Sequence, residues 1–462
     1  MPRTGAKAEV METKTDAHAS PLSWVMAAAR PLTGSIEDYD VLLERIGAAR
    51  FVLIGEASHG THEFYEERAR ITQRLIAEKG FSAVAVEADW PDAYRVNRYL
   101  RGQGEDKSGE QALAGFKRFP TWMWRNTEVV RFIEWLRRYN ESLPSRLPPV
   151  GFYGLDLYSL FTSISEVLRY LDKVDPQAAR QARARYACFD HFGRSSERYG
   201  YSTSYGLSAS CQDAVIAQMH ELNARAAEYV KRDGRAASDE LFYAQQNARL
   251  VTNAEQYYRT MFDRRVSSWN LRDRHMMETL DALARHLPRT EDGMPAKIVV
   301  WEHNSHVGDA RATDVGLAGE LTVGQLARES YGDQAFLVGM TTYQGSVTAA
   351  SDWDAPAERK RVLPALPGSH ETLFHQTGIG RFMLAFKGDR DLAQALSRRR
   401  LERAIGVIYR PETERSSHYF YACLPQQFDC VLHFDQTRAV EPLEWGDIWN
   451  LDEAPETFPA GL

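Results

Sequence analysis

The sequence predicts an α/β fold in which a central, mostly parallel sheet is flanked by helices. Short apolar runs rich in β-branched residues alternate with stretches of helical periodicity over the first 160 residues or so, a pattern typical of strand-helix-strand units. Strand signals are then absent over residues 159–287 and return from residue 298. The chain should therefore form one sheet whose two halves are separated in sequence by a large helical insertion.

The first half of the sheet is expected to contain three buried strands, at residues 51–55, 83–86 and 150–154. Apolar side chains at helical spacing predict a helix over residues 62–78, and Lys79-Gly80 provides its C-terminal stop. A second helix is expected after Pro91, because proline suits the first turn of a helix. The lengths of these alternating strand and helix segments are typical of an α/β fold with a parallel sheet.

The helical insertion is predicted from long stretches rich in Ala, Arg, Glu and Gln, such as residues 239–261. In the second half, strands are expected at residues 298–301, 335–338, 382–385 and 405–408, with a hairpin within 419–434. No internal repeat or proline-rich linker is present. We therefore expect a disordered tail at residues 1–20 and a single composite domain, with α/β halves at 21–158 and 291–462 around an insertion at 159–290.

Composition narrows the possible partners. Of the 462 residues, 44% are hydrophobic and 26% charged, the balance of an ordinary globular protein. The net charge of −7 produces no overall positive field, so neither nucleic acid nor an anionic membrane is an expected partner. No apolar run approaches the roughly 20 residues needed to cross a bilayer.

The four cysteines lack CxxC spacing and the N-terminus lacks a signal pattern, so a reducing cytoplasm is expected. The sequence indicates no particular oligomeric state.

Polar residues follow three of the predicted strands, where open α/β sheets bind their ligands. The segments are Gly55-Glu56-Ala57-Ser58-His59-Gly60, Glu87-Ala88-Asp89-Trp90 and Trp301-Glu302-His303-Asn304-Ser305-His306. Each signal alone has a structural explanation, such as a helix cap at Glu56. Together they indicate one shared site, because a protein gains no stability from burying several ionisable groups side by side.

Five ordered motifs also resemble the erythromycin esterase family. They are Gly55-Glu56-Ala57-Ser58-His59-Gly60-Thr61-His62-Glu63, Val86-Glu87-Ala88-Asp89-Trp90, Pro120-Thr121-Trp122-Met123-Trp124-Arg125-Asn126, Trp301-Glu302-His303-Asn304-Ser305-His306 and Tyr409-Arg410-Pro411-Glu412-Thr413-Glu414-Arg415. The resemblance runs from about residue 30 to about residue 440.

This resemblance implies an α/β fold and hydrolysis of an ester without a metal or other cofactor. In the known resistance enzymes of the family the ester is a macrolide lactone. Matching the motifs residue by residue implies that His59 is the base that activates water. The other functional positions that it implies are Glu56, Glu87, Arg68, His303 and His306.

The chemistry of these residues agrees with that assignment. A neutral imidazole such as that of His59 can take a proton from water near pH 7, and a carboxylate at Glu56 or Glu87 would hold its tautomer. Ester hydrolysis also places negative charge on the carbonyl oxygen, which His303, His306 or Arg68 could stabilise. Arg68 could equally form a structural ion pair with Glu56 or Glu87. The expected reaction is general-base hydrolysis of a small-molecule ester or lactone.

Aromatic residues near the predicted site suit a bulky substrate. Trp90, Trp122, Trp124 and Tyr158 could line a wide apolar cleft, or they could pack in the core. The sequence leaves this choice open.

Other functions fit these residues less well. A serine nucleophile is disfavoured, because neither Ser58 nor Ser305 lies in a GxSxG motif. Metal-dependent hydrolysis remains an alternative, because the same histidines and glutamates could ligate zinc or manganese, although the spacing from His303 to His306 differs from that of HExxH. A non-catalytic protein that binds a small molecule in the same cleft is the other alternative.

Overall fold

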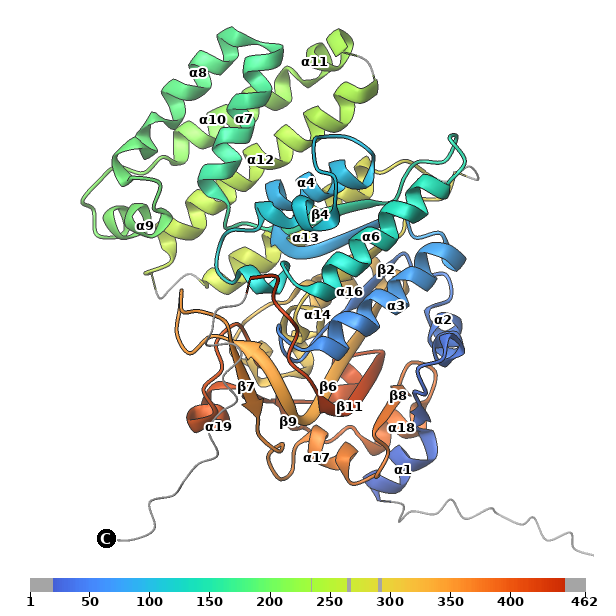
Figure 1. The fold of residues 1–462 in the computed structure, drawn as a ribbon. Coiled ribbons are helices and arrows are strands. Elements are labelled where there is room, and N and C mark those ends of the chain that lie inside the picture. The colour runs from blue at the N-terminus through green and yellow to red at the C-terminus, as the bar shows by residue number, and fades with distance from the viewer. Residues whose placement is uncertain (1–19, 234, 264–266, 290–292, 445–462) are drawn as a thin grey trace, which may run out of the picture.

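The computed structural model describes residues 20–233, 235–263, 267–289 and 293–444. The predicted tail lies outside these residues, apart from Ser20. A central sheet with helices on both sides forms the body of the molecule (Figure 1). The predicted α/β class is therefore confirmed.

Among the described residues the main sheet has nine strands, in the order β1-β8-β11-β6-β2-β5-β3-β4, with β7 paired to β6. The strands are β1 Arg30–Pro31, β2 Phe51–Ile54, β3 Ala83–Asp89, β4 Gly151–Asp156, β5 Ile298–Trp301, β6 Ala335–Ala349, β7 Glu358–Val362, β8 Arg381–Ala385 and β11 Cys430–Thr437. Strands β11, β6, β2, β5, β3 and β4 run parallel, whereas β1, β7 and β8 pair antiparallel. The sheet is thus mostly parallel, and β5 lies between two strands of the first half.

Alternation along the strands builds a core on each face of the sheet. In β2, Phe51 and Leu53 belong to one apolar cluster, and Val52 and Ile54 belong to the other. Helices on the Val52 face include α2 Asp40–Ile46, α3 His62–Lys79 and α6 Thr127–Ser142. Helices on the Phe51 face include α13 Ser268–His286 and α16 Val323–Tyr331. Because both faces of the central strands are covered, the strands are apolar throughout, as parallel strands usually are.

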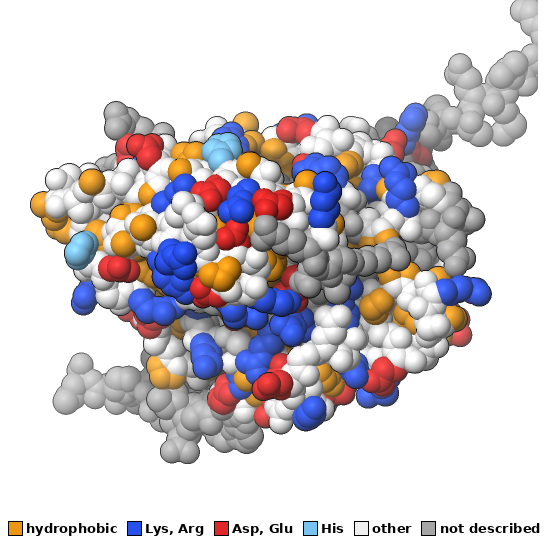
Figure 2. All heavy atoms as spheres, turned by 90° about the horizontal axis from the view of Figure 1, so that it is seen from above, with side chains coloured by type: hydrophobic (Ala, Val, Ile, Leu, Met, Phe, Trp, Pro, Cys, Tyr) orange, Lys and Arg blue, Asp and Glu red, His pale blue; other side chains and the backbone are white. Residues whose placement is uncertain are grey.

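Between β4 and β5 the described residues form helices and no strand. The α-helices are α7 Leu160–Val174, α8 Pro176–Tyr186, α9 Ser196–Ser204, α10 Gln212–Ala224, α11 Ala226–Asp233, α12 Arg235–Thr260 and α13. The first six gather at one end of the molecule, drawn in green to yellow in Figure 1. On the face seen from that end, Lys and Arg side chains are interspersed with Asp and Glu (Figure 2). Helix α12 packs on α7, whereas α13 returns to the sheet and packs on β4.

A disulfide joins Cys188 to Cys211 within this helical region. It connects the 3₁₀ helix η4 (Ala187–Phe192) to the residue before α10. The bond was not expected from the cysteine spacing, and disulfides are uncommon in the reducing compartment that the sequence predicted. Cys423 and Cys430 are free and buried.

The expected strand at residues 405–408 is wrong. This apolar segment forms only isolated bridges, one from Ile405 to Ser58 and one from Ile408 to Ala350. The Ile405 N–H donates to the Ala57 carbonyl at 2.7 Å, and the Ile405 side chain is fully buried. A loop that packs against the core can have the same apolar composition as a strand, which explains the error.

The hairpin expected within residues 419–434 is also wrong. Strand β10 (Tyr419–Ala422) pairs with β9 (Arg400–Arg403) in a separate two-stranded sheet, whereas β11 joins the main sheet. A short helix with proline in its first turn, α20 (Leu424–Gln427), separates the two strands.

Two other strands are longer than expected. β3 continues to Asp89, so Glu87 lies within the strand, and β6 extends from the expected four residues to Ala349. No helix in the described parts of the chain combines the length and apolar character needed to span a membrane.

Candidate active site

A cavity of about 500 Å³ lies at the carboxyl ends of β2, β5, β3 and β4, which are neighbours in the sheet. Residues from all four strand ends line it, among them His59, His303, Glu87 and Asp156. Its size is within the usual range for small-molecule sites, and its position is where open α/β sheets bind ligands.

Two glycines allow the loop after β2 to pack against its neighbours. A Cβ atom on Gly55 would lie 2.2 Å from Oδ1 of Asn304, and one on Gly60 would lie 1.8 Å from the Thr348 carbonyl oxygen. The Asn304 N–H donates to the Glu56 carbonyl at 2.8 Å, which ties the loop after β2 to the loop after β5. Because neither position has a side chain, the loop can pack closely against Asn304 and Thr348, and this packing fixes the position of His59 between the two glycines.

His59 and Glu56 form a hydrogen-bonded pair. Nδ1 of His59 lies 3.0 Å from Oε1 of Glu56, and Oε2 of Glu56 lies 2.9 Å from Nη2 of Arg68. Arg68 is 1% exposed, and its guanidinium stacks over the rings of Tyr65 and Trp301 at 4.4 and 5.2 Å. Glu56 and Arg68 thus lie behind His59, and neither lines the cavity. For Arg68, the structural ion pair is the arrangement observed.

Arg272 of α13 connects Glu87 to Asp156. Its Nη2 atom lies 2.7 Å from Oε1 of Glu87 and 2.7 Å from Oδ2 of Asp156, and its Nε donates to Oδ1 of Asp156 at 3.0 Å. Nη1 of Arg272 lies 2.9 Å from Nε2 of His306, whose Nδ1 lies 3.0 Å from Asp273. Since Arg272 can only donate, Nε2 of His306 accepts, and the proton of the neutral ring is on Nδ1.

The groups around Glu87 keep it ionised. Burial alone would raise the pKa of Glu87, but its interactions with His306, Arg272 and His59 outweigh burial and hold the pKa well below its ordinary value. Oε2 of Glu87 also accepts a hydrogen bond from the His303 N–H at 2.9 Å. Glu87 therefore orders the loop that carries the two histidines.

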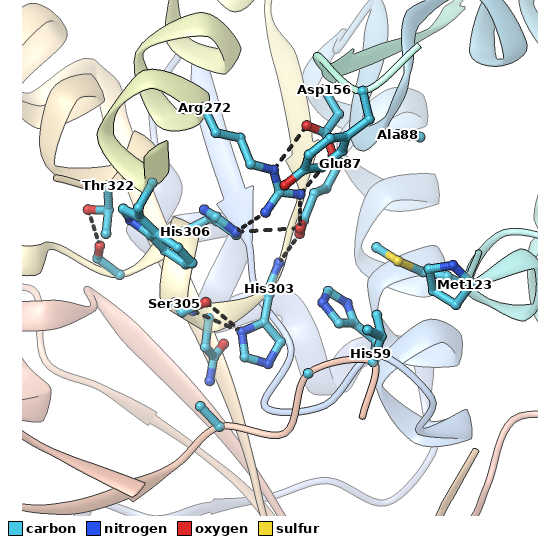
Figure 3. A pocket seen from close by; sticks show the side chains of 18 of the residues that line it. His59, Glu87, Ala88, Met123, Asp156, Arg272, His303, Ser305, His306 and Thr322 are labelled. Carbon is cyan, nitrogen blue, oxygen red and sulfur yellow. Dashed lines mark hydrogen bonds and ion pairs between the residues drawn. The ribbon is translucent and has the colours of Figure 1, made fainter. Parts of the chain in front are cut away.

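His303 lies beside His59, with their ring centroids 4.7 Å apart (Figure 3). The Ser305 N–H donates to Nδ1 of His303 at 3.2 Å, and the Ser305 hydroxyl lies 2.8 Å from the same atom. Burial, followed by the neighbouring imidazole of His59, holds the pKa of His303 well below its usual range. His303 is therefore neutral, and because Nδ1 accepts, its proton is on Nε2.

A second carboxyl group is buried beneath this loop. Glu302 is 1% exposed, and neither of its carboxyl oxygens has a hydrogen-bond partner among the described residues. Burial, followed by the charges of Glu87 and Asp273, raises the pKa of Glu302 well above its ordinary value. Burial thus favours the protonated form of Glu302.

The aromatic residues named from the sequence separate into two groups. Trp124 and Tyr158 line the cavity. Trp90 and Trp122 are 2% and 3% exposed and pack in the core. Further apolar lining comes from Phe116, Phe119, Met123, Trp269 and Trp353.

Sequence reasoning missed Arg272, Asp273 and Asp156. Asp156 lies two residues beyond the expected strand at residues 150–154 and could have been found by the strand-end rule. Arg272 and Asp273 are on a helix of the insertion, where no motif distinguishes them from other charged residues. Within the described ranges, no three His, Cys, Asp or Glu side chains are grouped so that they could hold a metal ion.

Comparisons with known proteins agree with the resemblance seen in the motifs. The erythromycin esterase family model matches residues 76–437. Erythromycin esterase type II from Escherichia coli is 24% identical over 331 residues, which cover 68% of this chain and 74% of that protein. A crystal structure of a Bacillus cereus protein covers 92% of this chain and 98% of its own, with a TM-score of 0.74 and 20% identity. A mutant of the erythromycin esterase EreC in its open conformation covers 90% of this chain and 96% of its own, with a TM-score of 0.62 and 17% identity. The structural matches show a shared fold.

Proposed function

Because the chain belongs to the erythromycin esterase family, we propose that it hydrolyses a carboxylic ester or lactone, with His59 as the general base that activates water. The observation that carries the proposal is the hydrogen bond between Nδ1 of His59 and Glu56. It puts the proton of the neutral ring on Nδ1 and leaves the lone pair on Nε2, which has no hydrogen bond to any described residue. His59 lines the cavity, so a water molecule held there can give its proton to Nε2.

The attacking water loses one proton to His59 as its oxygen bonds to the carbonyl carbon. The imidazolium that forms is stabilised by the carboxylate of Glu56, which Arg68 holds in place through its other oxygen. When the tetrahedral intermediate collapses, His59 returns the proton to the departing alkoxide. The products are one carboxylic acid and one alcohol, or a hydroxy acid when the substrate is a lactone.

His303 is the best candidate to stabilise the negative charge that develops on the carbonyl oxygen. It lines the cavity beside His59 and is neutral, and its proton is on Nε2, which is buried and has no hydrogen-bond partner among the described residues, so this donor is free for a substrate oxygen that reaches it. His306 is less suited to this role, because Asp273 and Arg272 already occupy its two nitrogens. We assign His306 and Glu87 to positioning Arg272 and the His303 loop.

The cavity supports a substrate with a large apolar part. Trp124, Phe116 and Trp269 are among its lining residues, and a volume of about 500 Å³ accommodates a molecule of drug-like size. A macrolide lactone is one such substrate. The protons in this reaction are transferred by His59, so the proposed reaction has no step that needs a metal ion.

A hydrolysis screen tests the proposal. Purified protein would be incubated with macrolides of different ring sizes and with simple aryl esters, and the products would be identified by mass spectrometry. Ring-opened or cleaved products formed by the wild type and not by His59→Gln would support it. Binding of these compounds without any product would favour the alternative of a non-catalytic binding protein.

A further inference from the structure

A second cavity lies among the helices of the insertion. It has a volume of about 430 Å³, and its walls come from α10, α12 and α13. Helix α12 packs on both of the other helices. No described residue lines both this cavity and the one at the strand ends, so the two are separate. We call it the insertion cavity.

The insertion cavity is lined by cationic side chains and, among the described residues, by no carboxylate. Its charged lining residues are Arg249 and Arg285, with His286 beside them. Nε2 of His286 lies 2.8 Å from Oδ1 of Asp239, so a protonated imidazole there already has a carboxylate partner outside the lining. The positive charge that remains unmatched in the wall is therefore that of the two arginines.

Arg249 is half-buried and has no carboxylate partner among the described residues. Its Nη1 donates to the Glu278 carbonyl at 2.9 Å, and its Nη2 donates to the Thr279 hydroxyl at 3.0 Å and to the side-chain oxygen of Gln246. All three acceptors are neutral. Burial is the main cause that lowers the pKa of Arg249 to about 10. The guanidinium therefore stays charged near neutral pH although part of its hydration has been removed.

Arg285 is exposed and lines the same cavity. No hydrogen bond or ion pair joins its guanidinium to another residue in the described ranges. Asp281 precedes it on α13 at the spacing of a helical ion pair, but accepts a hydrogen bond from the Tyr331 hydroxyl instead. Besides burial, the charge of Arg285 lowers the pKa of Arg249, so the two guanidinium groups are close enough to repel each other. A bound anion would relieve this repulsion.

The remaining wall suits an apolar group. Met219 of α10, Phe242 of α12 and Ala282 of α13 line the cavity. The Phe242 ring lies flat on the imidazole of His286, with the ring centroids 3.8 Å apart and an interplanar angle of 2°. This stack holds the Phe242 ring in place, so an apolar part of a ligand would meet a fixed surface.

We propose that the insertion cavity binds a small organic carboxylate, with Arg249 and Arg285 receiving the carboxylate and Phe242 contacting the apolar part. A guanidinium fork matches the two oxygens of a carboxylate, and the anion supplies the charge that both arginines lack. The apolar lining favours such a ligand over a bare inorganic anion. The site is separate from the proposed hydrolytic site and does not depend on the reaction proposed there.

Ligand-observed fluorine NMR with two probes of the same shape tests the proposal. The probe para-fluorobenzoate is ionised at pH 7, whereas para-fluorobenzamide is neutral. The wild type should bind the benzoate about tenfold more tightly or better, the scale of a hydrogen bond to a charged group. Inorganic phosphate should displace the benzoate only at a much higher concentration, because it cannot use the apolar wall.

Three variants locate the binding. Arg285→Gln and Arg249→Gln should each remove most of the preference for the benzoate. Arg285 is exposed, so its variant keeps the test decisive if Arg249→Gln fails to fold. The matched control is Arg274→Gln, which removes the charge of another exposed arginine of α13 that does not line the cavity, and it should retain the preference.

Equal affinity for the two probes in the wild type would overturn the proposal. A preference that survives in both lining variants would also overturn it, because the anion would then bind elsewhere. An equal loss in Arg274→Gln would reduce the effect to net charge, and displacement of the benzoate by phosphate at a similar concentration would show that the apolar wall is not used. Either result rejects the proposed carboxylate site.

Discussion

The imidazole of His59 and the carboxylate of Glu56 are 3.0 Å apart, and only the imidazole belongs to the wall of the cavity. This arrangement predicts that His59→Gln lowers kcat/KM for a confirmed substrate by about a hundredfold or more, the usual scale for loss of a general base. The control is His62→Gln, because His62 is in the same motif but bonds to Glu128 and does not line the cavity. Near wild-type turnover in His59→Gln would reject the assignment.

Glu56→Gln should reduce both turnover and stability. The glutamine oxygen can still accept from His59, but its amide group then faces the donors of Arg68, and the buried guanidinium loses its counterion. We expect kcat to fall by at least about tenfold, and the free energy of unfolding to fall by about 3–5 kcal/mol, the usual cost of an unpaired buried charge. Steady-state kinetics and urea unfolding measure the two effects. A variant with wild-type kcat would show that the carboxylate charge is not used in catalysis.

Arg272→Met should be among the more damaging substitutions in the site. It leaves the carboxylates of Glu87 and Asp156 buried without their shared cation, so a loss of about 3–5 kcal/mol is expected in urea unfolding. Arg183→Met provides the comparison, because Arg183 and its partner Asp172 are each about half exposed and should matter far less. Similar losses in the two variants would mean that burial of the Arg272 pairs has no energetic consequence.

Glu302 should make the folded state less stable as the pH rises. Its pKa is raised in the folded protein, so above about pH 4.5 the folded state binds more protons than the unfolded state and the free energy of unfolding falls with pH. Glu302→Gln keeps the shape and cannot ionise. The stability of this variant relative to wild type should therefore increase between pH 4.5 and pH 8 in denaturant titrations. A difference that stays constant over this range would contradict the raised pKa.

Activity should survive exhaustive dialysis against a chelator. Oε2 of Glu56 is paired with Arg68 and Oε1 of Glu87 with Arg272, so these carboxylates already have cationic partners. In the proposed reaction the proton is transferred by the His59 side chain. The measurement is the rate before and after dialysis, with zinc and manganese added back separately. Loss of activity that either ion restores would establish the metal-dependent alternative.

The strand ends were the most informative part of the sequence. Carboxyl ends of parallel strands meet at one edge, so His59, Glu87 and His303 could be assigned to one site from three short segments far apart in the chain. Arg272 could not be found in this way, because it reaches Glu87 from a helix 185 residues further along. Helical periodicity identifies an apolar face but does not indicate which of several arginines turns toward a neighbouring sheet.

Other errors have equally local causes. In the segment 405–408 only Ile405 is fully buried, in a loop, and apolar composition alone does not distinguish such a loop from a strand. The partner of Cys188 is 23 residues away, at Cys211, and their proximity depends on how η4 and α10 pack. Trp90 and Trp122 are near the site in sequence but turn into the core, since the direction of a side chain depends on the packing of the helix or turn that carries it.

The place of β5 between β2 and β3 has a consequence for synthesis of the protein on the ribosome. Residues of β2 and β3 are translated long before β5, which begins at Ile298, and at ordinary rates of translation this delay lasts roughly ten seconds or more. During that time neither β2 nor β3 has the strand that joins them, and their apolar side chains and backbone edges are open to wrong partners. Nascent chains that stop before residue 298 should therefore be bound by chaperones, and release into a protease-resistant form should begin only after β5 has left the exit tunnel.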